Sequence, residues 1–232
     1  MLNTSQIKAF TFDTGGTVLD WHTGFRKGFE HIINKYNLTI DSGDMANDFR
    51  RKSLNKVTNQ GHKNLINFDI SHKEAITQIC TEHSIKISKE DLNFLYYKTP
   101  TKLRVWSDFL KPFNTLKEKY LCVSFTLLSN RLVFLNSKRN KINWDLILSC
   151  ETLEVYKPNI EAYKKTAKML QLEPEECVMV ACHSFDLNAA QKAGFKTIFV
   201  KRPLEWGKNT NIVVDGKYDM VISDFSELLS LI

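Results

Sequence analysis

The sequence has no apolar run long enough to span a bilayer, and its N-terminus enters the first apolar run without a signal-peptide pattern. It also contains no internal repeat and no low-complexity tract. These absences argue against a membrane-spanning, secreted or repeat protein. With 232 residues, 43% of them hydrophobic and 25% charged, the chain can bury a full core, either as one domain or as a core with an insert.

The five cysteines follow no CxxC spacing. Their odd number and lack of pattern indicate free thiols and a cytoplasmic location. Cys122 and Cys177 lie in strand-like runs, where packing in the core is their expected role.

The net charge of +6, from 32 basic and 26 acidic residues, is spread along the chain. There is no recognisable nucleic-acid-binding module and no dense basic stripe with aromatics, so a nucleic-acid partner is not expected. The positive balance weakly favours small anionic substrates. We expect such a substrate as the partner, and no membrane. The sequence leaves the oligomeric state open, a homodimer included.

Apolar runs typical of buried strands alternate with helical patterns, which predicts an α/β fold with a parallel, Rossmann-like sheet and helices on both faces. The strand-like runs are Ile7–Asp13, Leu121–Ser129, Leu146–Cys150, Cys177–Cys182, Thr197–Lys201 and Asp219–Ile222. The helical patterns are Lys111–Tyr120, Glu161–Leu170, Asp186–Ala193 and Phe225–Leu231.

Residues 21–106 break this alternation. They contain few β-branched runs and several helix-like segments, such as Gly24–Tyr36 and Lys73–His83. We therefore expect a core domain formed by residues 1–20 and 107–232, and a helical insert formed by residues 21–106.

Asp13 ends the first strand-like run and is followed by Thr14, Gly15, Gly16 and Thr17. In open α/β sheets the reaction site lies at the carboxyl ends of the strands, so Asp13 is placed where a substrate arrives. The glycines allow a tight turn whose N–H groups can face an anion. Gly15 has no side chain to give or take a proton. A capping Asp at a strand-to-loop turn is the alternative interpretation of Asp13.

Polar residues follow three further strand-like runs. Ser129 and Asn130 follow the second run, although Ser-Asn is also an ordinary start of a loop. Further on come Lys157, in a Tyr-Lys-Pro triplet whose Pro is expected to start a helix, and Tyr163, for which core packing is an alternative. The fourth run ends at Cys182 and is followed by His183 and Asp186. A helix N-cap is the alternative role of Asp186.

These four segments resemble the motifs of the haloacid dehalogenase superfamily, in which the strand-end Asp of the first motif is a nucleophile. The resemblance covers most of the chain. Phosphatases of the superfamily carry a second Asp two residues later as acid/base, whereas the 2-haloacid dehalogenase branch does not. Gly15 makes this chain similar to that branch. The resemblance implies that the helical insert is a cap that closes over the strand ends and excludes water.

The resemblance implies a role for each motif residue. Asp13 would attack carbon and form an ester, Thr17 would hold its carboxylate, and the N–H groups of Thr14 and Gly15 would receive the substrate carboxylate. Ser129 and Asn130 would bind the same anion.

Lys157 would keep Asp13 ionised, Tyr163 would lie in the site, and Asp186 would help to activate the hydrolytic water. His183 stands where well-studied dehalogenases have Asn, and could replace it as a hydrogen-bond partner. Ala181 similarly replaces Ser.

In the insert, residues 49–52 resemble the cap segment that bears the Arg receiving the halide, a role that maps to Arg50. A solvated helix face is the alternative for Arg50. Phe185 and cap aromatics are expected to line the halide pocket. Residues 201–207 resemble a loop of the same branch and receive a structural role.

The superfamily's phosphatases hold magnesium with an Asp where this chain has Cys182, and a thiol is a poor magnesium ligand. We therefore expect no metal and no cofactor, and a hydrolase that converts short 2-haloalkanoic acids to 2-hydroxy acids. The alternatives are a magnesium-dependent phosphatase, a phosphonate-cleaving relative with the same metal requirement, or a non-catalytic protein with this fold.

Overall fold

The computed structural model describes residues 4–61, 63–208 and 211–231. Its main feature is a six-stranded sheet in the order β5-β4-β1-β6-β7-β8, in which every neighbouring pair is parallel. The strands are β1 (Ala9–Phe12), β4 (Leu121–Thr126), β5 (Leu146–Ser149), β6 (Cys177–Ala181), β7 (Lys196–Val200) and β8 (Met220–Ile222). The central strands β1 and β6 are buried along their whole length, as their continuous apolar sequence predicts.

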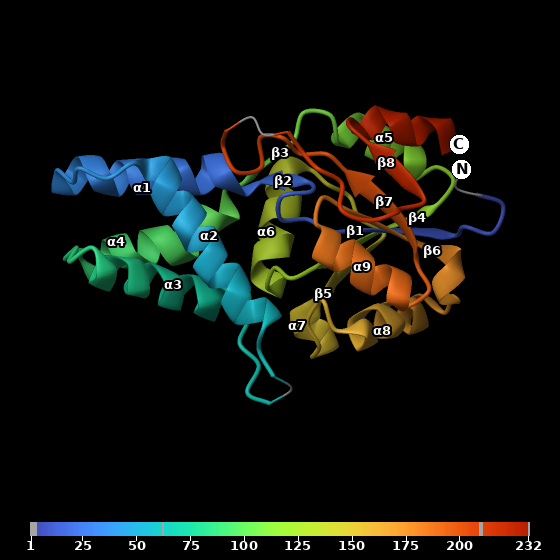
Figure 1. The fold of residues 1–232 in the computed structure, drawn as a ribbon, viewed down its shortest axis with the longest axis horizontal. Helices are drawn as coiled ribbons and strands as arrows, with labels where there is room; N and C mark the ends of the chain where they lie inside the picture. Colours follow the sequence, from blue (N-terminus) through green and yellow to red (C-terminus); the bar gives the residue numbers. More distant parts are fainter. Residues whose placement is uncertain (1–3, 62, 209–210, 232) are drawn as a thin grey trace.

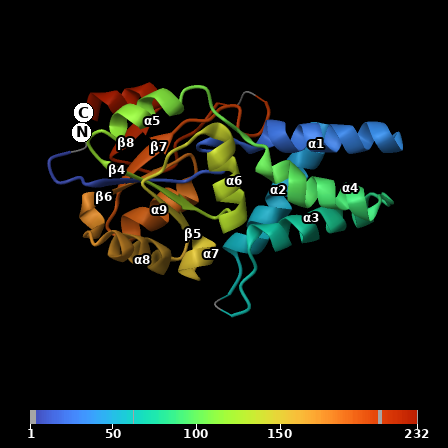
Figure 2. The ribbon, with the colours of Figure 1, turned by 180° about the vertical axis from the view of Figure 1, so that it is seen from behind.

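Helices cover both faces of this sheet, and Figures 1 and 2 show the layers from opposite sides. On one face α5 packs against the C-terminal helix η4, and on the other α8 packs beside α9. The flanking elements are α5 (Leu110–Leu116), α6 (Asn130–Asn140), α7 (Cys150–Leu153), α8 (Ile160–Leu170), η3 (Pro174–Glu176), α9 (Ser184–Lys192) and η4 (Phe225–Leu231).

An aromatic cluster fills the space between β1 and the α5–η4 face. The ring of Phe12 lies 5.8 Å from Phe109 and 5.9 Å from Phe113, both in edge-to-face geometry. Trp144 and Phe225 complete the cluster. Phe12, Phe109 and Phe113 are almost fully buried, so this packing fixes the strand that carries Asp13.

The insert projects beyond one end of the sheet as a group of helices (Figure 1). Its elements are α1 (Trp21–Tyr36), α2 (Ser42–Thr58), α3 (Phe68–Glu82), α4 (Lys89–Asn93), the π-helix η1 (Phe94–Lys98) and η2 (Thr99–Thr101). At its base β2 (Leu19–Asp20) pairs antiparallel with β3 (Arg104–Val105). Side chains cap the long helices, as where Asp20 accepts a hydrogen bond from the Thr23 N–H at the start of α1.

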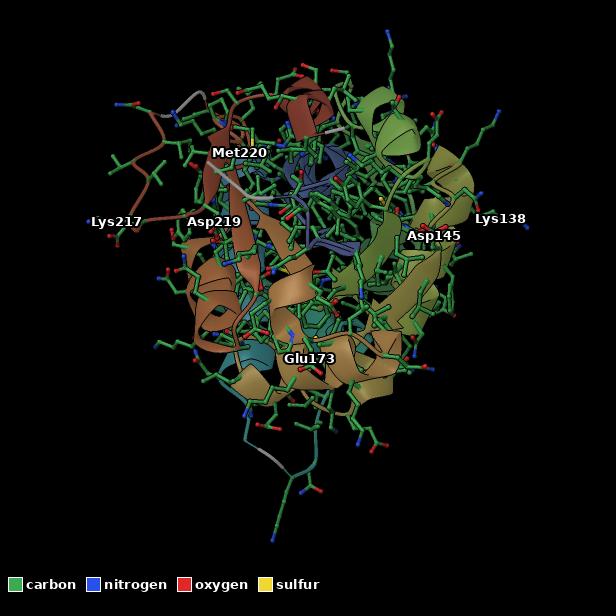
Figure 3. The ribbon with its side chains drawn as sticks, turned by 90° about the vertical axis from the view of Figure 1, so that its right-hand side faces the viewer. Lys138, Asp145, Glu173, Lys217, Asp219 and Met220 are labelled. Carbon is green, nitrogen blue, oxygen red and sulfur yellow. The ribbon has the colours of Figure 1, made fainter. Side chains whose placement is uncertain are left out.

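The insert lies at the carboxyl ends of the strands. Figure 3 shows the opposite end of the molecule, where Asp145, Glu173 and Asp219 lie just before β5, β6 and β8 begin. Within residues 4–61, 63–208 and 211–231, no helix is both long and apolar enough to cross a membrane.

The predicted fold class is confirmed, with all six strands in one parallel sheet. Several local predictions differ from the structure. Residues 225–231 form a 3₁₀ helix, and Pro158 precedes the helix that begins at Ile160 after the N-cap Asn159. Helices α2 and α6 and the two-stranded β2–β3 sheet were not predicted as elements. The domain bounds at residues 20 and 107 stay a prediction.

Candidate active site

Asp13 follows β1 directly, and its backbone N–H donates to the Val180 carbonyl of β6 over 3.0 Å. Its carboxylate accepts hydrogen bonds at both oxygens. Lys157 Nζ lies 3.1 Å from Oδ1, while Thr17 Oγ1 donates to Oδ2 over 2.8 Å and His183 Nδ1 lies 3.2 Å from Oδ2. Burial disfavours the charge, but Lys157, His183 and Thr17 outweigh it and hold the pKa of the Asp13 carboxyl well below its usual range.

Lys157 is fully buried and joins two carboxylates. Besides Asp13, its ammonium donates to Asp186 Oδ2 over 2.5 Å and to the Phe125 carbonyl of β4 over 3.0 Å. Burial alone would lower the pKa of Lys157, but Asp13 and Asp186 raise it. The predicted proximity of Lys157 to Asp13 is therefore present, and the ammonium stays charged.

Asp186 lies in the first turn of α9 with its side chain turned into the core. Tyr163 of α8 donates to Asp186 Oδ1 over 2.6 Å and also packs edge-to-face on Phe125. The N-cap position of α9 belongs to His183, so the N-cap alternative for Asp186 is wrong. Burial raises the pKa of Asp186 despite Lys157. Asp13 is thus the firmly ionised carboxylate, and Asp186 is the one more easily protonated.

His183 connects Asp13 to a residue that the sequence did not single out. Its Nε2 lies 2.8 Å from Oε1 of Glu205, which is buried and also accepts a hydrogen bond from the Trp21 indole. Burial would lower the pKa of His183, but Cys182, Glu205 and Asp13 raise it well above its ordinary value. Residues 201–207, for which a structural role is expected, therefore also carry a side chain that contacts the candidate site. No spacing pattern in the sequence predicts this contact, because Glu205 is a single acidic residue in a loop.

Arg50 extends from α2 of the insert to the Asp13 loop. It is buried, and its Nη2 donates to the Gly15 carbonyl over 3.2 Å. Its guanidinium also lies over the rings of Trp21 and Phe68, 5.4 and 5.7 Å from their centroids. The solvated-face alternative for Arg50 is therefore wrong. Within the described residues its buried Nε has no hydrogen-bond acceptor.

A small pocket lies at this junction of insert and core. Asp13, Gly15, Arg50, His183 and Phe185 line it, and the remaining lining residues are Leu54, Phe68, Thr126, Leu127 and Leu128. Its volume is about 10 Å³, room for one water molecule. A cavity of about 500 Å³ lies elsewhere, between the end of α2 and the start of α8. We place the candidate site at the small pocket because the charged groups gather there, and not at the larger cavity.

The structure does not bring every predicted residue to the pocket. The Ser129 hydroxyl donates to Asp69 of α3 over 2.7 Å, and the Asn130 side chain accepts from Thr152. The Thr14 hydroxyl pairs with that of Thr126. In this conformation Asp69 holds the hydroxyl expected to meet the substrate anion. The anion-binding role of these residues and of the Thr14 and Gly15 N–H groups stays a prediction.

The donors around Asp13 do not fit a magnesium ion. Magnesium requires oxygen ligands in octahedral geometry. The carboxylates of Asp13 and Asp186 both contact the Lys157 ammonium, and Arg50 and His183 add further positive groups. The remaining position holds the Cys182 thiol, whose pKa burial raises. A divalent cation placed between the two carboxylates would be repelled by the positive charge of the Lys157 ammonium.

Residues 10–200 match the family described as haloacid dehalogenase-like hydrolases. The chain belongs to this family. The family supports a hydrolase and agrees with the parallel sheet and the strand-end Asp13.

The solved structures and the curated relatives that the chain resembles carry names from different branches of the family. A defluorinating L-2-haloacid dehalogenase, Rha0230, superposes with a TM-score of 0.89 at 26% identity, covering 99% of this chain and 98% of the other. The L-2-haloacid dehalogenase of Xanthobacter autotrophicus with covalently bound chloropropionic acid gives 0.81 at 16% identity, covering 97% and 98%. Pyrophosphatase PpaX of Bacillus mycoides is 24% identical over 98% of this chain and 97% of its own length.

Proposed function

We propose that this protein hydrolyses the carbon–halogen bond of short 2-haloalkanoic acids without a metal, through an ester on Asp13. The observation that carries the proposal is the pairing of Arg50 with the Gly15 carbonyl beside Asp13. Gly15 offers no acid/base group, and the adjacent space is occupied by a guanidinium, which suits a departing halide. The likeness to the haloacid dehalogenase Rha0230 supports the same reaction class.

In the first step, an Asp13 oxygen attacks C2 of the substrate from the side opposite the halogen. A C–O bond forms, the carbon–halogen bond breaks, and its electron pair leaves with the halide, so the configuration at C2 inverts. The low pKa of Asp13 keeps the nucleophile ionised at neutral pH. The Nε of Arg50, which lacks an acceptor within the described residues, can donate to the leaving halide.

In the second step, water attacks the carboxyl carbon of Asp13 and not C2. Asp186, whose pKa is raised, takes the proton of the water, and Lys157 stabilises the oxyanion that forms. Tyr163 holds the Asp186 carboxylate in place, and His183 contacts the Asp13 side of the ester. Collapse of the intermediate breaks the bond between the Asp13 carboxyl carbon and the ester oxygen, and Asp186 returns its proton to that oxygen, so the product leaves as a 2-hydroxy acid. Asp13 then loses the remaining proton to solvent and is restored as a carboxylate.

We expect the smallest substrates of this class to be favoured. A volume of about 10 Å³ does not accommodate even a two-carbon haloacid unless side chains or the cap move. Phe68 and Phe185 flank the space with Leu54 and Leu128. We therefore expect haloacetates to be turned over better than 2-halopropionates.

A family phosphatase is the second candidate, because the curated relatives are named Pyrophosphatase PpaX. The surroundings of Asp13 argue against it, since Gly15 supplies no acid/base group and Lys157 occupies the space between the carboxylates. A non-catalytic protein is the third candidate. The ionised Asp13 and its contacts with Lys157, Thr17 and His183 favour a working site.

The test is a release assay on the purified full chain. Halide release is measured from fluoro-, chloro- and bromoacetate and both 2-chloropropionate enantiomers, with EDTA present. Phosphate release is measured from an aryl phosphate and from pyrophosphate, with and without magnesium. We expect halide release that EDTA does not reduce. Magnesium-dependent phosphate release without halide release would assign a phosphatase, and no turnover on either panel would favour the non-catalytic protein.

A further inference from the structure

Three side chains of different chemistry meet around the His183 ring, beside the pocket. Cys182 Sγ lies 3.5 Å from His183 Nε2 and 3.6 Å from Glu205 Oε2, and Nε2 lies 2.8 Å from Glu205 Oε1. The three groups lie within 4.8 Å of one another and are buried or partly buried. The dehalogenation steps described above do not use the Cys182 thiol.

We propose that Cys182, His183 and Glu205 form a binding site for zinc or a similar soft divalent cation, and that its occupation inhibits the enzyme. Thiolate, imidazole and carboxylate are the three ligand types that zinc takes in proteins. Tetrahedral zinc with ordinary bond lengths separates its ligand atoms by about 3.3–3.6 Å. The 3.5 Å between Cys182 Sγ and His183 Nε2 and the 3.6 Å between Sγ and Glu205 Oε2 lie in this range. His183 Nε2 contacts the other carboxylate oxygen, Oε1, at 2.8 Å, so the Glu205 carboxylate must turn for a single oxygen to serve as the third ligand.

The surroundings of the cluster provide the partners that such ligands need. A metal-bound histidine usually donates its other ring N–H to a carboxylate, and the Nδ1 of His183 lies 3.2 Å from Asp13 Oδ2. The Trp21 indole donates to Glu205 and orients it. Gly16 leaves the necessary room, since a Cβ there would lie 2.3 Å from Glu205 Oε1.

Binding replaces two protons with the metal. The Cys182 thiol and the Nε2–H of His183 each release a proton to solvent, and the cation binds the thiolate, the imidazole nitrogen and the Glu205 carboxylate. His183 is then neutral and fixed, and it keeps only the Nδ1–H that faces Asp13. His183 Nδ1 faces Asp13 Oδ2 without the metal as well, and the metal fixes the ring so that this contact no longer adjusts when Asp13 attacks. We therefore expect zinc to suppress attack by Asp13.

The binding test uses the full chain without an affinity tag, and zinc itself as the probe. Calorimetry should show one strong site per chain in the wild type. Cobalt in place of zinc should give the near-ultraviolet charge-transfer absorption of a thiolate ligand. Losing a residue that only hydrogen-bonds a metal ligand typically weakens metal binding by roughly 10–100-fold. Cys182 would be a ligand itself, so Cys182→Ser should weaken zinc binding by at least this factor. Cys80→Ser is the matched control, because Cys80 is the other partly exposed cysteine.

Unchanged zinc affinity in Cys182→Ser, or no binding in the wild type, would overturn the site. In a second arm, zinc should reduce halide release in the wild type and Cys80→Ser, and EDTA should restore it. For Cys182→Ser, halide release with zinc should equal the rate that the same variant shows without zinc. Binding without inhibition would overturn the inhibitory role. The binding arm does not depend on the proposed function, so a chain without dehalogenase activity would still test the site.

Discussion

Ser129 of the core donates its hydroxyl to Asp69 of the insert over 2.7 Å, which ties the cap to the residue expected to meet the substrate anion. Arg131 also pairs with Asp69. On the proposed function, a substrate carboxylate would compete with the Asp69 carboxylate for the Ser129 hydroxyl. The small pocket and this contact agree with the proposed role of the insert as a cap over the strand ends.

Asp69→Ala should free these donors for the substrate. We expect the KM for chloroacetate to fall severalfold with a smaller change in kcat, because a competing acceptor is removed while the groups around Asp13 stay in place. Steady-state halide release measures both constants. In the double variant Asp69→Ala, Ser129→Ala the gain in KM should shrink. A higher KM in Asp69→Ala would instead indicate that the contact only holds the cap closed.

Asp13→Asn should abolish halide release while the fold is retained, because an amide does not supply the attacking oxygen. Circular dichroism checks the fold, and a halide assay checks the rate. In ¹⁸O-labelled water, single turnover by the wild type should place the label in the peptide that contains Asp13, since water attacks its carboxyl carbon. Label found only in the product would contradict the ester.

Lys157→Met should lower kcat by about two orders of magnitude, the scale typical of losing one electrostatic group in an active site. The stem is kept, but Asp13 and Asp186 lose the ammonium between them. Lys157→Arg should not restore the rate fully, because a planar guanidinium does not replace a compact ammonium that serves three acceptors. Lys164→Met, on the exposed face of α8, is the control. A kcat within error of wild type for Lys157→Met would refute the role.

The parts of the site that the sequence predicted share a local origin. Each of the three residues Asp13, Lys157 and Asp186 comes after a buried strand in the sequence. Parallel strands bring their carboxyl ends to one edge of the sheet, so these residues meet there. The contacts that the sequence did not predict depend on tertiary packing. Glu205 lies in an irregular loop and reaches His183 only through the folded chain, and the direction of the Ser129 hydroxyl depends on Asp69, which another helix carries.

Asp91 should stabilise the cap at neutral pH and lose this effect in acid. Its carboxylate accepts hydrogen bonds from Lys35, Tyr36 and Ser88, which lower its pKa from 3.8 to about 2. Because the pKa in the folded protein is depressed, the stabilisation is present above pH 3.8 and is lost as the pH falls toward 2.

Asp91→Asn should therefore lower the free energy of unfolding at pH 6, and the difference from wild type should narrow as the pH approaches 2. Urea unfolding followed by circular dichroism at both ends of this range measures the effect. A penalty independent of pH would mean that the shape of the side chain, and not its charge, stabilises this end of the cap.

Glu205→Gln tests whether the buried carboxylate matters through its charge. The amide oxygen can still accept the His183 Nε2–H, so the shape of the contact is kept while the negative charge beside His183 and Arg50 is removed. A hydrogen bond to a charged group contributes about 1.5–3 kcal/mol, so we expect kcat to fall by about tenfold or more. The KM should change little, because Glu205 does not line the pocket.

Glu205→Ala, which removes the acceptor as well, should be slower still, and the exposed Glu30→Gln should match wild type. Thermal unfolding separates loss of structure from loss of rate, since a folded Glu205→Gln with reduced kcat isolates the effect of the charge. If Glu205→Gln keeps its kcat and Glu205→Ala loses it, the carboxylate acts only by holding the ring of His183. Equal activity in both variants would remove Glu205 from the site altogether.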